Sequence, residues 1–411
     1  MRERKPALIF IFFTLFLDIL GIGLIIPILP KLVEKLQGGD VAAAAHTVGI
    51  LSALYAAMQF VFAPILGSLS DRYGRRPVIL GSLFGSGLDY ILLAFAPTLS
   101  LFYVGRIVAG ITGANITAAS AYIADVSPPE KRAANFGIIG AAFGLGFIAG
   151  PALGGFLGSK DLRLPFLVAA GLTMANWLYG YFVLPESLAK ENRRNFSWRR
   201  ANPIGSLAAL RRYPVVAGLA GTSFLLNLSQ FSLHATWVLY TGHRYGWNPG
   251  QVGWSLATVG IMAAVVQGGL TRRIIPAIGE KKALTIGLML GAFSMFGYGL
   301  ATEGWMIYVI LLVGSTGGIA GPASQGLISR NVADNEQGAV QGALTSLSSI
   351  AGIFGPLIGT SLFGYFISPG APVQLPGAPF LVGGVLTLVA LFLALRTLAR
   401  HPSAAKPANV V

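Results

Sequence analysis

Residues 67–77 read Gly67-Ser-Leu-Ser-Asp71-Arg72-Tyr-Gly74-Arg75-Arg76-Pro77, a charged, glycine-containing run inside an otherwise apolar region. An apolar stretch of about 20 residues lies on each side of it, the length that an α-helix needs to cross the hydrocarbon of a membrane. The run is therefore expected to be a short polar loop between two membrane-spanning helices. Its three arginines predict that the loop lies on the cytoplasmic side, where Lys and Arg are in excess.

The whole chain has the composition of a membrane protein. Of its 411 residues 54% are hydrophobic and 11% are charged, whereas soluble domains carry about 25% charged residues. The longest polar stretch, roughly residues 185–213, leaves no room for a soluble catalytic domain. We predict an all-α membrane protein with twelve spans at residues 7–29, 47–69, 77–97, 99–124, 134–158, 164–184, 214–241, 250–270, 283–301, 304–328, 338–367 and 378–397.

Basic residues are distributed unevenly between the two sides of these spans. The net charge is +14, yet one side receives only Lys31, Lys35, Lys160, Arg163 and Arg244. The positive-inside rule makes the richer side cytoplasmic, and an even number of spans places both termini there. Topology thus explains the charge, so we expect the lipid bilayer and no nucleic acid as a partner. The chain has no cysteine, which excludes disulfides and thiolate metal sites.

The chain divides into two halves with the same landmarks. Gly342 follows Gly137 by 205 residues, and Gly279 follows Gly74 by the same 205 residues. Such a repeat of two six-span halves is typical of a two-bundle transporter with its substrate site between the halves; the alternative is a coincidence in a glycine-rich chain. We predict three parts: an N-terminal six-helix bundle at 1–189, a cytoplasmic linker at 190–212 and a C-terminal six-helix bundle at 213–411.

Three charged residues fall well inside predicted spans, away from the span ends. Asp18 lies near the middle of the first span, Asp89 near the middle of the third, and Arg106 in the fourth. A charge at the bilayer centre costs about 2.5–3.5 kcal/mol on insertion scales, and such residues usually mark proton or substrate pathways. Each acid is expected either to handle a proton or substrate cation or to bond a neighbouring helix permanently. Arg106 needs an acidic partner, and a fixed ion pair with one of these acids is one interpretation of it.

The loop at 67–77 is a candidate gate. Its arginines can reach carboxylates on other helices, and the expected target is the acid at the inner end of the fourth span. Such a cluster can lock one state of a transporter and break when the state changes; anchoring by positive charge alone is the alternative. The predicted gate residues are Gly67, Asp71, Arg72, Gly74, Arg75, Arg76 and Asp125.

The fifth span carries small residues at four-residue spacing. One helix face then lets another helix approach closely, and a proline bends the span. The functional interpretation is a sealed, hinged contact between the halves, and the alternative is generic close packing. The residues of this motif are Gly146, Gly150, Pro151, Gly154 and Gly155.

Polar and aromatic residues within the spans are candidates for a small-molecule cavity. Each of them can equally be a helix-packing residue. They are Tyr55, Gln59, Asn115, Asn227, Gln230, Phe231, His234, Trp237, Gln267 and Gln325. The sequence has no phosphate-binding loop, no His-Glu-x-x-His pair and no Gly-x-Ser-x-Gly elbow. It therefore predicts neither an enzyme nor a cofactor, and makes protons rather than ATP the expected energy source.

Four motifs resemble those of the major facilitator superfamily, in its twelve-span drug–proton antiporter group. They are the 67–77 loop, Arg106-Ile-Val-Ala-Gly110, the Gly146–Gly155 motif and Leu17-Asp18-Ile-Leu-Gly21-Ile-Gly23. The first half most resembles tetracycline exporters, in Met58-Gln59-Phe60 and Leu88-Asp89-Tyr90. The resemblance implies the major facilitator fold, alternating access, and a role for Arg106 in tuning a proton-carrying acid.

The second half departs from those exporters. They carry a histidine in the eighth span and an aspartate in the ninth, where this chain has Ala263 and Gly291. The departure moves coupling to the first half and makes a more hydrophobic or differently charged substrate plausible.

The combined expectation is a monomeric antiporter of the cytoplasmic (inner) membrane that exports small amphipathic compounds in exchange for protons through Asp18 and Asp89. The alternatives are an exporter or flippase of an endogenous lipid or metabolite, proton-driven uptake, and a non-transporting receptor on the same fold.

Overall fold

The computed structural model describes residues 8–113, 115–128, 132–194, 196, 207, 210, 212–333 and 336–401. These residues form helices and connections, with no strand among them. Within the described ranges, twelve helical segments are long and apolar enough to cross a membrane, which confirms the predicted all-α, twelve-span architecture. The linker predicted at 190–212 lies largely outside the described residues.

The chain forms two compact units. Unit 1 comprises residues 1–39, 54–202 and 247–260, and unit 2 comprises residues 40–53, 203–246 and 261–411. The beginning of the second span thus belongs to unit 2, and the beginning of the eighth span to unit 1.

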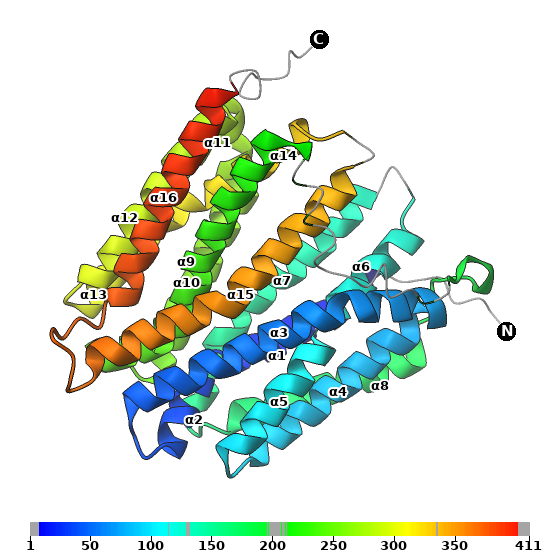
Figure 1. Ribbon diagram of the computed structural model, residues 1–411. Helices are drawn as coiled ribbons and strands as arrows, with labels where there is room; N and C mark the ends of the chain where they lie inside the picture. The colour runs from blue at the N-terminus through cyan, green and yellow to red at the C-terminus, as the bar shows by residue number, and fades with distance from the viewer. Residues whose placement is uncertain are drawn as a thin grey trace. The chain divides into compact units, whose positions relative to one another are not determined.

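Unit 1 contains the first six spans except for the beginning of the second. Its core lies where α1 packs against α7 and α8, and where α4 packs against α5 and α8 (Figure 1). Phe10, Leu15, Ile79, Leu83 and Tyr122 are among its fully buried side chains. The helices are α1 (Leu8–Ile25), α2 (Leu29–Leu36), α3 (Val41–Tyr73), α4 (Arg75–Phe95), α5 (Leu99–Thr112), α6 (Asn115–Val126), α7 (Arg132–Gly158), α8 (Leu164–Val183) and the short η2 (Lys190–Asn192).

Unit 2 is built around α9, which packs against α15 and α16 (Figure 1). Val216, Leu284, Leu288, Ala323 and Leu398 belong to its buried core. The elements are α9 (Pro214–Tyr245), α10 (Pro249–Val265), η4 (Val266–Leu270), α11 (Thr271–Ile278), α12 (Glu280–Leu300), α13 (Gly304–Ser315), η5 (Thr316–Ile319), α14 (Ala320–Arg330), α15 (Gln337–Ile367) and α16 (Ala378–Arg400). Of these, η4 is a π-helical turn within the eighth span, a feature often found at functional sites.

The glycines of the fifth span permit a close helix crossing in unit 1. A Cβ added to Gly150 of α7 would lie 2.7 Å from the Cα of Gly23 in α1. Gly146 and Gly154 likewise face α1, at Ile19 and Leu24. These three glycines therefore act within one bundle, between the first and fifth spans.

Two other residues of the same motif face the eighth span. A Cβ added to Gly155 would lie 3.0 Å from the Cα of Gly253, and the carbonyl of Pro151 lies against Gly253 as well. This part of α10 belongs to the second half of the sequence but groups with unit 1. The motif thus has two faces, one toward α1 and one toward the start of α10.

The repeat predicted from sequence has a backbone counterpart. Gly74 precedes α4 with φ of 107°, and Gly279 precedes α12 with φ of 80°. Residues with side chains rarely adopt these angles, so glycine is required at both turns. The same turn therefore opens the third and ninth spans.

Candidate functional site

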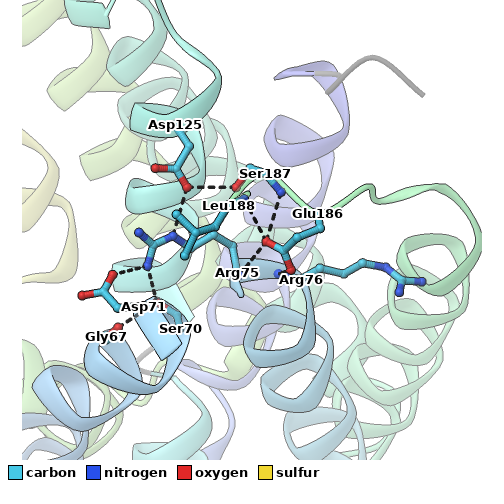
Figure 2. A network of polar contacts seen from close by, with 9 residues as sticks. All are labelled: Gly67, Ser70, Asp71, Arg75, Arg76, Asp125, Glu186, Ser187 and Leu188. Atoms are coloured by element: carbon cyan, nitrogen blue, oxygen red, sulfur yellow. Dashed lines mark hydrogen bonds and ion pairs between the residues drawn. The ribbon is translucent and has the colours of Figure 1, made fainter. Parts of the chain in front are cut away.

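Arg75 is the centre of a polar network at one end of unit 1 (Figure 2). Its Nε donates to Asp125 Oδ2 at 3.0 Å, and its Nη1 donates to Ser70 Oγ at 2.8 Å and to Asp71 Oδ1. The Arg75 side chain is only 9% exposed. The guanidinium thus joins the first turn of α4 to the last turns of α3 and α6, with ion pairs that compensate for its burial.

Glu186, which the sequence analysis missed, completes this network. Its carboxylate accepts the backbone N–H groups of Arg75 at 2.8 Å, Arg76 at 3.2 Å, Ser187 at 3.0 Å and Leu188 at 3.1 Å. Two of these donors are unpaired N–H groups at the start of α4, which an acid stabilises. Glu186 therefore acts as an N-terminal cap supplied from beyond the end of the sixth span.

Ser187 links the same segment to the ion pair. Its Oγ donates to Asp125 Oδ2 at 3.0 Å, the oxygen that Arg75 also contacts. The backbone N–H of Arg194 donates to the carbonyl of Asp71 at 3.0 Å. We call Ser70, Asp71, Arg75, Asp125, Glu186 and Ser187 the Arg75 network. The only sequence signal for Glu186 was an acid placed directly after a span on the basic side.

The other predicted gate residues lie around the network. Arg76 donates to the carbonyl of Tyr181 at 2.6 Å, and its guanidinium lies 5.7 Å from that ring. Arg72 lies over the ring of Tyr73 at 5.1 Å. Among the described residues neither arginine forms an ion pair. A Cβ on Gly67 would lie 3.2 Å from Thr117, so this glycine allows α3 and α6 to pack closely.

The intramembrane charges gather in unit 1. Arg106 Nη2 lies 3.5 Å from Asp89 Oδ2, and the Asp89 side chain has no exposed surface. Gly105 makes room for that carboxylate, because a Cβ there would lie 2.7 Å from Asp89 Oδ1. Asp18 is buried in α1, 4% exposed. The structure therefore pairs Arg106 with Asp89, on neighbouring helices.

Tyr55 and Gln59 connect these charges to a break in the fourth span. The Arg106 guanidinium lies 5.9 Å from the centre of the Tyr55 ring. Gln59 Nε2 donates to Tyr55 Oη at 3.3 Å and to the carbonyl of Gly113 at 3.2 Å. Gly113 follows the last residue of α5, so Gln59 holds the point where the helix is interrupted. Asn115 begins α6, and its side chain lies outside the described part of the chain.

Two predicted cavity residues of unit 2 do line a cavity. Its volume is about 140 Å³, and Asn227 and Gln325 line it together with the hydroxyls of Thr222, Ser223 and Ser324. Leu226, Leu284, Leu288 and Ala320 supply apolar surface. The lining has amide and hydroxyl groups but no charged side chain, so it suits the uncharged, hydrogen-bonding part of a small molecule.

The remaining candidates of unit 2 lie elsewhere. Trp237 is buried against the rings of Tyr298 and Phe380, at 5.2 and 6.2 Å between ring centres. Phe231 packs against Gly355 of α15. Three further residues have side chains that are partly or largely exposed: Gln230, His234 and, in the π-helical turn, Gln267.

Unit 2 contains a charge-reversed counterpart of the Arg75–Asp125 pair. Arg330 Nη2 lies 3.2 Å from Glu280 Oε1. Glu280 follows Arg75 by 205 residues, and Arg330 follows Asp125 by the same 205 residues. An acid at a helix start and a base at a helix end interact favourably with the helix dipole, whereas a base at the start and an acid at the end interact unfavourably with it. The pair in unit 2 therefore agrees with both dipoles, and the pair in unit 1 opposes both.

Comparison with known proteins places these features in a family. Residues 11–356 match the model of the Major Facilitator Superfamily. The chain is 43% identical to the tetracycline resistance protein, class C, of Escherichia coli over 389 residues, 95% of this chain and 96% of that protein. It is 40% identical to the class E protein of Escherichia coli over 350 residues, 85% of this chain and 86% of that one.

A solved structure agrees with these relatives. The human organic anion transporter MFSD10 is 26% identical to this chain and superposes with a TM-score of 0.70, covering 96% of this chain and 100% of its own. The family model includes every helix of the Arg75 network, and the two resistance proteins cover 95% and 85% of the chain. The chain belongs to the major facilitator superfamily.

Proposed function

We propose that this protein exports small amphipathic drugs, tetracycline among them, in exchange for protons. The family consists of transporters rather than enzymes, and relatives at 43% and 40% identity are named for tetracycline resistance. The observation that carries proton coupling is the buried Asp89–Arg106 pair with Asp18 on a neighbouring span. Buried intramembrane acids of this kind are typical of proton relays.

Asp89 has the geometry of an acid that can exchange a proton. Its contact with Arg106, at 3.5 Å, is longer than the 2.7–2.9 Å that is usual for charge-assisted hydrogen bonds. Its Oδ1 has no hydrogen-bond partner among the described residues. A proton can bind at Oδ1 while Oδ2 faces the guanidinium. Protonation would weaken the pair and free Arg106 to interact with Asp18.

The Arg75 network acts as the gate in this proposal. Arg75 and Asp125 each interact unfavourably with the dipole of the helix on which they lie, so they depend on their pairing and on their contacts with Asp71 and Ser187 to stay there. Glu280 and Arg330 each agree with the dipole and remain stable when separated. We infer that the pair in unit 1 breaks and re-forms during transport, whereas the pair in unit 2 is a permanent brace.

The two units have different roles in this proposal, proton coupling in unit 1 and uncharged substrate recognition in unit 2. The candidate proton-coupling groups all belong to unit 1, and the uncharged cavity of Asn227 and Gln325 belongs to unit 2. Ala263 and Gly291 add no charge to unit 2, so substrate recognition there rests on amides, hydroxyls and apolar surface. We propose further that both termini lie on the cytoplasmic side of a bacterial inner membrane, which the excess of Lys and Arg in the loops of that side supports, and that the working unit is a monomer.

Transport into everted membrane vesicles tests the proposed function. Vesicles energised by respiration should accumulate tetracycline, and a protonophore should abolish the accumulation. Accumulation that survives the protonophore would overturn proton coupling. Absence of accumulation for tetracycline and other drugs would favour the export of an endogenous lipid or metabolite.

A further inference from the structure

Unit 1 also contains a cavity, which lies at the end opposite the Arg75 network. Its volume is about 470 Å³, and it lies between the end of α2 and the connection from α7 to α8. The helix α8 begins beside this cavity and ends just before Glu186, so its 20 residues separate the two sites by about 30 Å. The lining residues are Leu32, Lys35, Leu36, Gly158, Ser159, Lys160, Asp161, Leu162 and Arg163.

The cavity collects most of the bases on its side of the membrane. Of the five assigned to that side, Lys35, Lys160 and Arg163 line it, and Lys31 lies one helical turn from Lys35 and is neutralised by Glu34 at 2.9 Å. Asp161 supplies the one acid of the lining. Three positive charges against one negative charge leave the cavity with a net charge of +2.

Arg163 is held in place as part of the cavity wall. Its Nη1 donates to the carbonyl of Ala94 at 2.7 Å and its Nη2 to that of Ala96 at 2.9 Å, both at the end of α4. A guanidinium has five N–H groups, so three remain for a ligand. Its own backbone N–H donates to Asp161 Oδ1 at 2.7 Å, which fixes the turn. The cation is thus pre-positioned and does not have to be ordered when an anion binds.

The cavity borders apolar surface of the kind that faces lipid. Lys160 Nζ lies 4.5 Å from the centre of the Phe156 ring, and that side chain is 56% exposed on α7. Leu32, Leu36 and Leu162 line the cavity itself. Basic groups next to exposed apolar side chains match a ligand with an anionic head and hydrocarbon chains.

We propose that this cavity binds the headgroup of an anionic phospholipid, with the phosphate at Arg163, Lys35 and Lys160 and an acyl chain along Phe156. That the lipid comes from the outer leaflet rests on the proposed orientation of the chain. Bases on the outer side of a membrane protein are uncommon, and a bound anion explains why they gather at one cavity. Guanidinium and ammonium groups together are well suited to a phosphodiester.

Lipid retention measured by native mass spectrometry tests this site. The protein is released from nanodiscs containing equal amounts of phosphatidylglycerol and phosphatidylcholine, and the lipids that remain bound are counted. The test variant is Lys35→Gln with Lys160→Gln. The matched control is Lys281→Gln with Lys282→Gln, two exposed lysines at the start of α12. Unchanged melting temperatures in detergent show that both variants are folded.

The wild type and the control should retain phosphatidylglycerol preferentially. The test variant should lose about 25-fold in that preference, from about fivefold for each lysine near the membrane surface. Equal retention of the two lipids by the wild type, or the same preference in the test and control variants, would overturn the proposal. Displacement of the lipid by millimolar glycerol 1-phosphate would identify a site for free phosphate compounds instead. None of these results depends on drug transport, so the lipid site and the proposed function fail separately.

Discussion

The charge reversal between the two ion pairs predicts that they open with different ease. When a pair separates and its side chains leave the helix ends, each charge loses its interaction with the dipole, worth about 0.3–1 kcal/mol. For Arg75 and Asp125 both dipole interactions are unfavourable, so losing them lowers the free energy of the separated pair by about 0.6–2 kcal/mol. For Glu280 and Arg330 it is a cost of the same size.

Asp125→Asn is the perturbation that exposes this difference. The variant keeps an oxygen for Arg75 Nε and Ser187 Oγ but removes its charge, and hydrogen bonds to charged groups contribute about 1.5–3 kcal/mol. Because 1.4 kcal/mol is a factor of ten, local opening should become about 10 to 100 times more frequent. The matched variant is Glu280→Gln, whose partner is 46% exposed. Exposed pairs contribute at most about 1 kcal/mol, so opening there should rise about fivefold at most.

Hydrogen–deuterium exchange of the purified protein measures both openings. The N–H groups of Arg75 and Arg76 donate to Glu186, and that of Ala283 donates to the carbonyl of Gly279, so these amides report on the two helix starts. Exchange rates of protected amides follow the local opening equilibrium. Unchanged exchange at Arg75 in Asp125→Asn, or equal acceleration at Ala283 in Glu280→Gln, would refute the claim that the buried pair in unit 1 holds its helix start more strongly than the exposed pair in unit 2 holds its own.

Three further predictions concern unit 1. Asp89→Asn cannot exchange a proton, so drug accumulation in energised vesicles should fall at least tenfold while drug binding persists; accumulation at the wild-type rate would exclude Asp89 as a carrier. Gly150→Ala places a Cβ 2.7 Å from Gly23 Cα and should lower the melting temperature through overpacking of about 1–3 kcal/mol, whereas Gly144→Ala, with nothing within 4 Å, should not. Glu186→Gln should weaken the cap by about 1 kcal/mol and speed exchange at Arg75 about fivefold, and unchanged exchange would show that the cap is dispensable.

Hydropathy predicted the number of spans but not their ends. The second span was predicted at 47–69, and the helix runs from Val41 to Tyr73. Its start is capped by Asp40, whose Oδ1 accepts the N–H groups of Ala42 and Ala43 at 2.9 and 3.0 Å. A helix can continue in water beyond the hydrocarbon, and only capping residues then mark its end.

The sequence did not predict the breaks within spans. The fourth span is interrupted at Gly113, which Gln59 contacts from 54 residues away, and the eighth contains the π-helical turn η4. Both features depend on side chains from other helices or on local crowding. The hydrophobic pattern is continuous across them.

The polar network was predictable in part. The loop at 67–77 indicated that an arginine would meet Asp125, and Arg75 does so. Glu186 and Ser187 lie about 110 residues further along the chain, and no local pattern marks a carboxylate that caps a distant helix. The reversed pair of Glu280 and Arg330 is visible in the sequence only once the 205-residue offset is applied to both of its members. The predicted domain boundaries at 189 and 213 stay a prediction. The structure adds a feature that they do not describe, because unit 2 contains the start of α3 and unit 1 contains the start of α10.

The most direct test of proton-coupled export is proton flux in proteoliposomes that contain a pH-sensitive dye. Addition of tetracycline to wild-type proteoliposomes should trigger proton movement opposite to the drug, and Asp18→Asn should abolish it without loss of drug binding. Drug transport without any proton movement, or the same flux in Asp18→Asn as in the wild type, would contradict coupling through the buried acids of unit 1.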